Sequence, residues 1–167
     1  SGGGERRRDL PLIIEGLQGQ GFAVELRPTT GPGSATELAA SAAAEGFDVV
    51  CTLGGDGTVN ETINGLAGGD VPLAIVPTGT VNVLAMELGI PLDPPDAVRV
   101  VGTGTESWID LGLAGERYFG LMAGIGMDAA VVASLNPTLK KALKEAAFAI
   151  QGVATYLTHE EPLLRLT

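Results

Sequence analysis

Two glycine-rich segments carry the residues best suited to chemistry, and each directly follows an apolar run. The first reads Gly54-Gly-Asp-Gly-Thr58 and the second Pro77-Thr-Gly-Thr-Val-Asn82. Glycine lets the backbone turn sharply and approach an anion closely, so that main-chain N–H groups and the start of a following helix can hold a phosphate. In the second segment, the glycine has polar residues close to it in sequence, namely Thr78, Thr80 and Asn82. The segments therefore predict a phosphate site, although strand-to-helix turns use the same residue types.

Asp56 does not suit a simple phosphate loop. A carboxylate repels a phosphate unless a divalent cation or a proton-donating hydroxyl lies between them. Its position in the first segment therefore indicates one of these partners; the alternative is that Asp56 only caps a tight turn. Glu61 has a structural interpretation too, because Thr58-x-x-Glu61 is a capping box, in which the carboxylate would hold the start of its own helix.

Apolar and polar residues around these segments alternate in patterns typical of helices and strands. A helix is expected over about residues 6–20 and a strand at Phe22–Arg27. A capping box at Ser34-x-x-Glu37 predicts a second helix. The same alternation continues with strands at Asp48–Leu53 and Val71–Val76 and helices at about 58–66 and 81–88. Strands that alternate with helices predict an α/β fold, with a mostly parallel sheet and helices on both faces, over residues 1–105.

Asp93-Pro-Pro predicts the start of one more helix before residue 105. After residue 105 the pattern changes. Two strand-like runs then lie on either side of Ala114-Gly-Glu116, which predicts an antiparallel hairpin. We therefore expect residues 106–167 to begin a second structural unit.

The composition narrows the function. Ten Lys and Arg against 20 Asp and Glu give a net charge of −10, which disfavours a nucleic-acid groove. Cys51 is the only cysteine, so an intrachain disulfide is excluded. The chain has no run of about 18 apolar residues, and its N-terminus lacks the apolar region of a signal peptide. We therefore expect a cytoplasmic protein that holds any anionic substrate through local contacts.

Together these motifs resemble the catalytic domain of the diacylglycerol kinase family, which includes the bacterial soluble lipid kinases and the sphingosine kinases. Gly54–Thr58 is followed by Asn60-Glu61 and Asn64-Gly65, and the second segment reads P-x-G-T-x-N. The first segment alone also occurs in NAD kinases, whereas the P-x-G-T-x-N block separates the two families. Further matching segments are Trp108–Gly112, Tyr118-Phe119, Gly124–Asp128 and Leu139-Lys140.

The resemblance implies an enzyme, an ATP-dependent lipid kinase that transfers the γ-phosphate to a lipid hydroxyl such as that of diacylglycerol. Asp56 would be the catalytic residue, close to Mg²⁺ and to the reacting hydroxyl. Glu61 resembles the family's nucleotide-sugar contact, an interpretation that competes with its capping role. The other implied nucleotide-binding residues lie in the two glycine-rich segments: Gly54, Gly55, Gly57, Thr58, Thr78, Gly79, Thr80 and Asn82.

On the acceptor side, the resemblance implies that residues 106–167 begin a β-rich lipid-substrate domain. Asp128 resembles a residue that meets the lipid headgroup hydroxyl; alternatively, it caps the next helix. Lys140 resembles a lysine that binds phosphate in the bacterial enzymes, but it also fits the solvated face of an amphipathic helix. A lipid substrate implies peripheral contact with a membrane. The sequence does not fix the oligomeric state, and a homodimer is compatible with it.

The family pattern is incomplete at both ends of the chain. Family members open with a strand that ends in N-P-x-S-G-G-G, of which Ser1–Gly4 remains, and they continue into a domain with a D-G-E motif. We therefore expect a fragment, about half of a two-domain enzyme, whose sheet lacks its first strand and which is inactive alone. Two alternatives stay open: a kinase for a soluble acceptor such as NAD, and a non-catalytic ATP-binding module.

Overall fold

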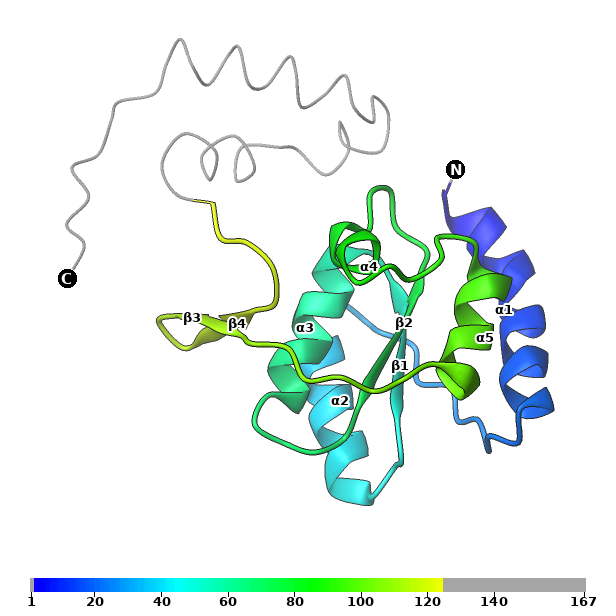
Figure 1. Cartoon of the computed structure of the whole chain (residues 1–167), viewed down its shortest axis with the longest axis horizontal. Coiled ribbons are helices and arrows are strands. Elements are labelled where there is room, and N and C mark those ends of the chain that lie inside the picture. The colour runs from blue at the N-terminus through cyan, green and yellow to red at the C-terminus, as the bar shows by residue number, and fades with distance from the viewer. Residues whose placement is uncertain (1, 125–167) are drawn as a thin grey trace, which may run out of the picture. The chain divides into compact units, whose positions relative to one another are not determined.

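The computed structural model describes residues 2–124, in which helices surround a short parallel sheet and a small hairpin follows (Figure 1). The elements are α1 (Gly2–Gly19), α2 (Ser34–Glu45), β1 (Val50–Gly54), α3 (Asp56–Leu66), β2 (Leu73–Pro77), α4 (Val83–Glu87), α5 (Pro94–Thr103), β3 (Gly112–Ala114) and β4 (Arg117–Phe119). Each expected helix in this range is present, with its ends shifted by a few residues. The expected strands are also present, apart from the one at residues 22–27.

β1 and β2 form a parallel sheet between two layers of helices. The register places Val50 opposite Leu73 and Gly54 opposite Pro77. Helices α1 and α5 pack together on one side, and α2 and α3 pack together on the other (Figure 1). This arrangement confirms the α/β class with a parallel sheet. It also brings the carboxyl ends of β1 and β2 side by side, where ligands bind in open α/β sheets.

The core follows from the alternation of side chains along β2. Ile75 and Val76 are successive residues, so they point to opposite faces of the sheet. Val76 is completely buried, in a cluster with Ile13 and Leu17 of α1. On the other face, Ile75 joins a second cluster, formed with residues of α3 and α4: Val59, Ile63, Leu84 and Ala85. These two clusters fix the helices on which the site depends.

The strand expected at residues 22–27 is wrong. Phe22 and Val24 do pack against the core while Ala23 is exposed, so the alternation of faces is present. The backbone, however, pairs with no other strand among the described residues. A cavity of about 410 Å³ lies beside this segment, with residues of α1, α2 and β1 in its remaining walls. Strands form through ladder hydrogen bonds to a neighbour, and within the described residues this segment has no such neighbour.

Arg27 anchors the same segment to α2. Its guanidinium makes ion pairs with Glu25 and Glu45, and it lies 4.9 Å from the centre of the Phe47 ring. The hydrogen bonds from Arg27 lower the pKa of Glu45 to about 2. These contacts fix the position of Arg27 relative to α2, just before the loop that leads to that helix.

The hairpin of β3 and β4 is antiparallel, as expected, and shorter than the two runs suggested. Leu113 lies opposite Tyr118 in its register. The hairpin packs against α3 within one compact unit, Gly2–Leu121. Asn64 of α3 joins them: its Nδ2 donates to the Tyr118 carbonyl and its Oδ1 accepts the Tyr118 N–H, each at 2.9 Å. The Asn64 side chain thus satisfies the outer edge of β4 as a neighbouring strand would.

Candidate functional site

The two glycine-rich segments lie next to each other at the ends of β1 and β2. The Thr78 N–H donates to the Gly54 carbonyl at 3.0 Å, which extends the pairing of the strands by one step. Gly55 and Gly79 then meet backbone to backbone, because a Cβ atom built on Gly79 would overlap the Cα atom of Gly55. Only glycine allows this approach. The structure therefore joins the two sequence motifs into a single site.

Asp56 occupies the first position of α3 and links that helix to the second segment. One carboxylate oxygen accepts the Asn82 N–H at 3.1 Å, and the other accepts the Leu84 N–H at 3.4 Å. The side chain is exposed in spite of these contacts. Asp56 thus performs a capping role, the alternative that its sequence context offered, and it caps the neighbouring α4. Its carboxylate is fixed in orientation and still open to solvent.

The start of α3 is suited to hold an anion. Its N-cap is Gly55, in an extended conformation and without a side-chain cap. Thr58 is the third residue of the helix, so it is not an N-cap, and the predicted capping box with Glu61 is wrong. The first N–H groups of a helix have no partner within the helix, and the helix dipole adds a partial positive charge there. These groups are the donors that a phosphate needs.

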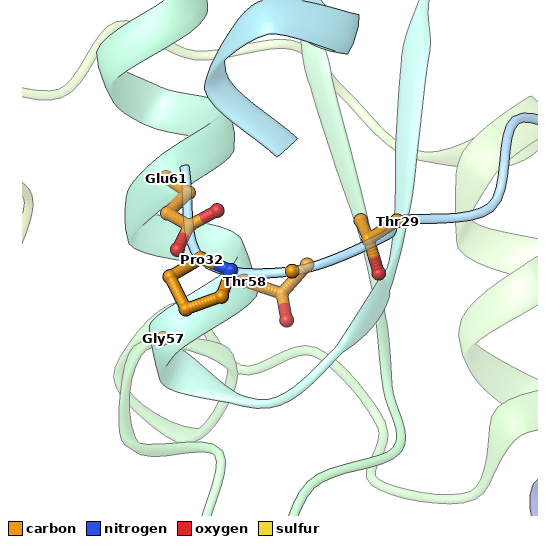
Figure 2. A pocket seen from close by; sticks show the side chains of 6 residues that line it. Thr29, Pro32, Gly57, Thr58 and Glu61 are labelled. Atoms are coloured by element: carbon orange, nitrogen blue, oxygen red, sulfur yellow. The ribbon is translucent and has the colours of Figure 1, made fainter. Parts of the chain in front are cut away.

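A pocket of about 320 Å³ opens beside the first two turns of α3 (Figure 2). Three of its lining residues, Gly57, Thr58 and Glu61, were expected from the sequence. The opposite wall is the loop before α2, which contributes Thr29, Gly31 and Pro32 and crosses in front of α3 in Figure 2. This loop was not expected from the sequence. The only signal for it is a Thr-Thr-Gly-Pro-Gly run before a helix, which is also typical of an ordinary turn.

Glu61 caps α2 instead of its own helix. Its carboxylate accepts the N–H of Ala35, the second residue of α2, at 3.3 Å. The Thr36 hydroxyl returns a bond of 2.9 Å to the Glu61 carbonyl. Ser34, predicted to open α2 as a cap with Glu37, is the first helical residue; the N-cap is Gly33, without a side-chain cap. Because a carboxylate from α3 already serves this end of α2, a local capping box is unnecessary.

The second segment contributes to the site through its backbone and one amide. Asn82 is buried, and its side chain bonds twice to Gly79. Thr80 is exposed at the turn, and Thr78 is half-buried. None of these residues lines the pocket beside α3, so they touch the site from the side of Gly55 and Asp56. Asp128 and Lys140, expected on the acceptor side, lie outside the described residues.

The residues of the site fit a phosphate group better than a metal held by protein ligands alone. Within residues 2–124, no group of three or more His, Cys, Asp or Glu side chains gathers to hold a metal ion. Asp56 offers one carboxylate, which suits Mg²⁺, because Mg²⁺ commonly binds through one or two carboxylates together with substrate phosphates.

In the part of the chain that the structure covers, no helix has the length and apolarity needed to cross a membrane.

Comparison with known proteins places these features in a family. The profile of the diacylglycerol kinase catalytic domain matches residues 1–114. A Pseudomonas putida protein named "Probable lipid kinase YegS-like" is 35% identical over 150 residues, which are 89% of this chain and 50% of that protein. A Bacillus subtilis diacylglycerol kinase is 34% identical over 150 residues, 88% of this chain and 50% of the relative.

Solved structures agree with the sequence comparison. The crystal structure of a diacylglycerol kinase from Bacillus anthracis superposes with a TM-score of 0.62 at 31% identity, over 68% of this chain and 40% of that one. The chain spans about half the length of the relatives that it matches. The pair of glycine segments, the parallel sheet and these similarities agree with one another, and the chain belongs to the diacylglycerol kinase catalytic domain family.

Proposed function

We propose that this chain is the nucleotide-binding part of a lipid kinase, which transfers the γ-phosphate of ATP to a lipid hydroxyl. The observation that carries the proposal is the joined pair of glycine segments beside the uncapped start of α3. Backbone N–H groups supply the positive potential, in a molecule whose net charge of −10 supplies none overall. Family membership and the names of the relatives support a lipid as the acceptor.

In this proposal the nucleotide phosphates lie against the first turn of α3. The N–H groups of Asp56, Gly57 and Thr58 face them, and Thr58 also lines the adjoining pocket. Gly54 and Gly55 let the backbone come close, while Thr78, Gly79 and Thr80 support the nucleotide from the second segment. Glu61 borders the pocket and also caps α2, so it serves the nucleotide at least by holding the pocket wall in place.

Asp56 acts on the acceptor hydroxyl. The hydroxyl oxygen forms a bond to the γ-phosphorus, the bond from that phosphorus to the β–γ bridging oxygen breaks, and ADP leaves with its electron pair. The Asp56 carboxylate accepts the hydroxyl proton. Mg²⁺, when bound, neutralises the developing charge on the phosphates, and Asp56 is the ligand that this part of the chain offers. The two N–H bonds from α4 hold the carboxylate in one orientation throughout.

The acceptor side of the proposal rests on residues 106–167, as the start of a lipid-substrate domain with Asp128 at the headgroup and Lys140 at a phosphate. A lipid acceptor requires the protein to visit a membrane surface, so we propose a cytoplasmic enzyme with peripheral membrane contact. The β3–β4 hairpin, which Asn64 holds on α3, belongs to the same compact unit as the nucleotide site, Gly2–Leu121.

The test compares two proteins: the 167-residue chain, and an extended chain in which the flanking segments of the Bacillus subtilis relative are fused to both ends. Each receives Mg-ATP labelled at the γ-phosphate, with diacylglycerol vesicles or with NAD. We expect labelled lipid from the extended chain and none from the shorter one. Labelled NAD in preference to lipid would replace the proposal with a soluble-acceptor kinase. Bound ATP with no labelled product would leave a binding module.

A further inference from the structure

Asn82 has an unusual backbone conformation. It is the one non-glycine residue with a positive φ in the part of the chain that the structure describes, with φ 60° and ψ 52°. L-residues avoid this left-handed region, although asparagine tolerates it better than most. Conformations of this kind persist only where the surroundings impose them, and they are concentrated at functional sites. The contacts of Asn82 show what the conformation achieves here.

The side chain of Asn82 holds Gly79, and its backbone holds Asp56. Oδ1 accepts the Gly79 N–H at 2.9 Å, and Nδ2 donates to the Gly79 carbonyl at 3.2 Å. The Asn82 N–H donates to the Asp56 carboxylate at 3.1 Å. The residue is 8% exposed, so water does not compete well for these bonds. One residue therefore fixes both the glycine of the second segment and the carboxylate of the first.

These contacts set the geometry between the two segments. Gly79 touches the backbone of Gly55, and Gly55 directly precedes Asp56 in the chain. Asn82 therefore contacts both ends of this arrangement, Gly79 and Asp56. If Asn82 left the left-handed region, its N–H would turn away from Asp56 and the Gly79 contact would open. We propose that Asn82 is a positioning residue, which sets the direction of the Asp56 carboxylate relative to the glycine backbone. This inference rests on the proposed function, in which Asp56 receives the acceptor proton.

Two substitutions separate the backbone conformation from the side chain. Asn82→Gly adopts a positive φ without strain and keeps the N–H that Asp56 accepts. Asn82→Ala disfavours that conformation and removes the amide. Because a small misplacement of a reacting group lowers turnover steeply, we expect Asn82→Ala to reduce the kcat of the extended chain by more than about tenfold. Asn82→Gly should recover most of this loss, and the KM for ATP should change less than kcat in both variants.

Amide hydrogen exchange supplies a readout that needs no ligand. In the 167-residue and extended chains, the Gly79 and Leu84 amides should exchange faster in Asn82→Ala than in the wild type. Asn82→Gly should leave Leu84 slow and release Gly79, because it removes only the side-chain bonds. Gly68→Ala is the matched control: it places alanine at a φ of 80° in an exposed turn at the other end of β2, and should alter neither kcat nor these amides.

The possible outcomes distinguish the positioning role of Asn82 from the proposed kinase function. Unchanged exchange at Leu84 in Asn82→Ala, or a kcat equal to that of the wild type, overturns the positioning role. A kcat for Asn82→Gly as low as that for Asn82→Ala overturns the claim that the backbone conformation is what matters. If the wild-type extended chain transfers no phosphate at all, the proposed function fails, and the exchange pattern alone decides whether Asn82 holds Asp56.

Discussion

The carboxylate of Glu61 accepts a hydrogen bond from the backbone N–H of Ala35, so a residue in the second turn of α3 caps the start of α2. Close packing reinforces the contact, because a Cβ atom on Gly65 would overlap the Thr36 carbonyl. The pocket beside α3 lies between that helix and the loop that enters α2. Its wall is therefore held by a contact between residues 26 positions apart in the sequence.

Substitution of Glu61 tests whether its carboxylate stabilises α2. Glu61→Met removes the acceptor for the Ala35 N–H and should lower the free energy of unfolding by about 1 kcal/mol, as the loss of an N-cap usually does. Glu61→Gln keeps an oxygen at this position and should lose less than half as much. Urea denaturation of the two variants measures the difference. Equal destabilisation by Gln and Met would show that the Ala35 bond does not stabilise α2.

The close approach of Gly55 and Gly79 predicts opposite effects for two glycine substitutions. In Gly79→Ala, the new Cβ would overlap Gly55 and lie 2.6 Å from the Asn82 Oδ1, and neither neighbour can move freely. We expect a loss of roughly 2 kcal/mol or more in the free energy of unfolding. In Gly57→Ala the new Cβ meets nothing within 4 Å, and the residue lies in the first turn of α3, so the substitution should not destabilise the protein and should stabilise it by at most about 0.5 kcal/mol. A Gly79→Ala protein as stable as the wild type would contradict the contact.

The Asn64 amide should hold the β3–β4 hairpin on α3. Asn64→Leu has a similar volume but leaves the Tyr118 N–H and carbonyl without their side-chain partner. We expect a loss of about 1–3 kcal/mol and faster exchange of the Tyr118 amide. Asn60→Leu, one turn earlier on the same helix, is the control. If Tyr118 exchanges equally fast in the wild type and Asn64→Leu, the amide is not what holds the hairpin.

Cys51 should be unreactive while the protein is folded. Burial raises the pKa of its thiol from the ordinary 9.0 to about 12, so at pH 8.5 the thiolate is roughly a thousandfold scarcer than in the unfolded chain. Iodoacetamide should therefore label Cys51 slowly until denaturant is added. Because the folded protein keeps the thiol protonated at pH values where the unfolded chain ionises it, the free energy of unfolding should fall as the pH rises from 9 toward 12. Cys51→Ala should remove that part of the pH dependence; rapid labelling of the native protein would contradict the burial.

The arrangement of the two glycine segments could be predicted from the sequence. Apolar strands that alternate with helices give parallel pairing, and parallel strands place their carboxyl ends at one edge. The two segments should therefore be neighbours, and the register places Gly54 opposite Pro77. The pairing of residues 22–27 could not be predicted in the same way. Alternation states which side chains face the core, as Phe22 and Val24 do, and says nothing about whether a neighbouring strand is present.

The caps and the pocket wall depend on tertiary contacts that a local pattern does not contain. Thr58-x-x-Glu61 matches a capping box, yet Gly55 starts the helix and the Glu61 carboxylate binds another helix. The loop with Thr29 and Pro32 reads as an ordinary turn, and it becomes part of the site only because Arg27 and α2 hold it against α3. Such partners lie too far apart in the sequence for spacing to reveal them.

The proposed phosphate site is tested most directly by finding where Mg²⁺ and a non-hydrolysable ATP analogue bind the extended chain. Backbone amide chemical shifts, followed by NMR during a titration, report this site residue by residue. We expect the largest changes at Asp56, Gly57, Thr58 and Gly79, and none at Gly68 and Gly69 beyond the other end of the helix. Changes confined to the cavity between α1 and β1, with the start of α3 unaffected, would contradict the assignment of the phosphate site.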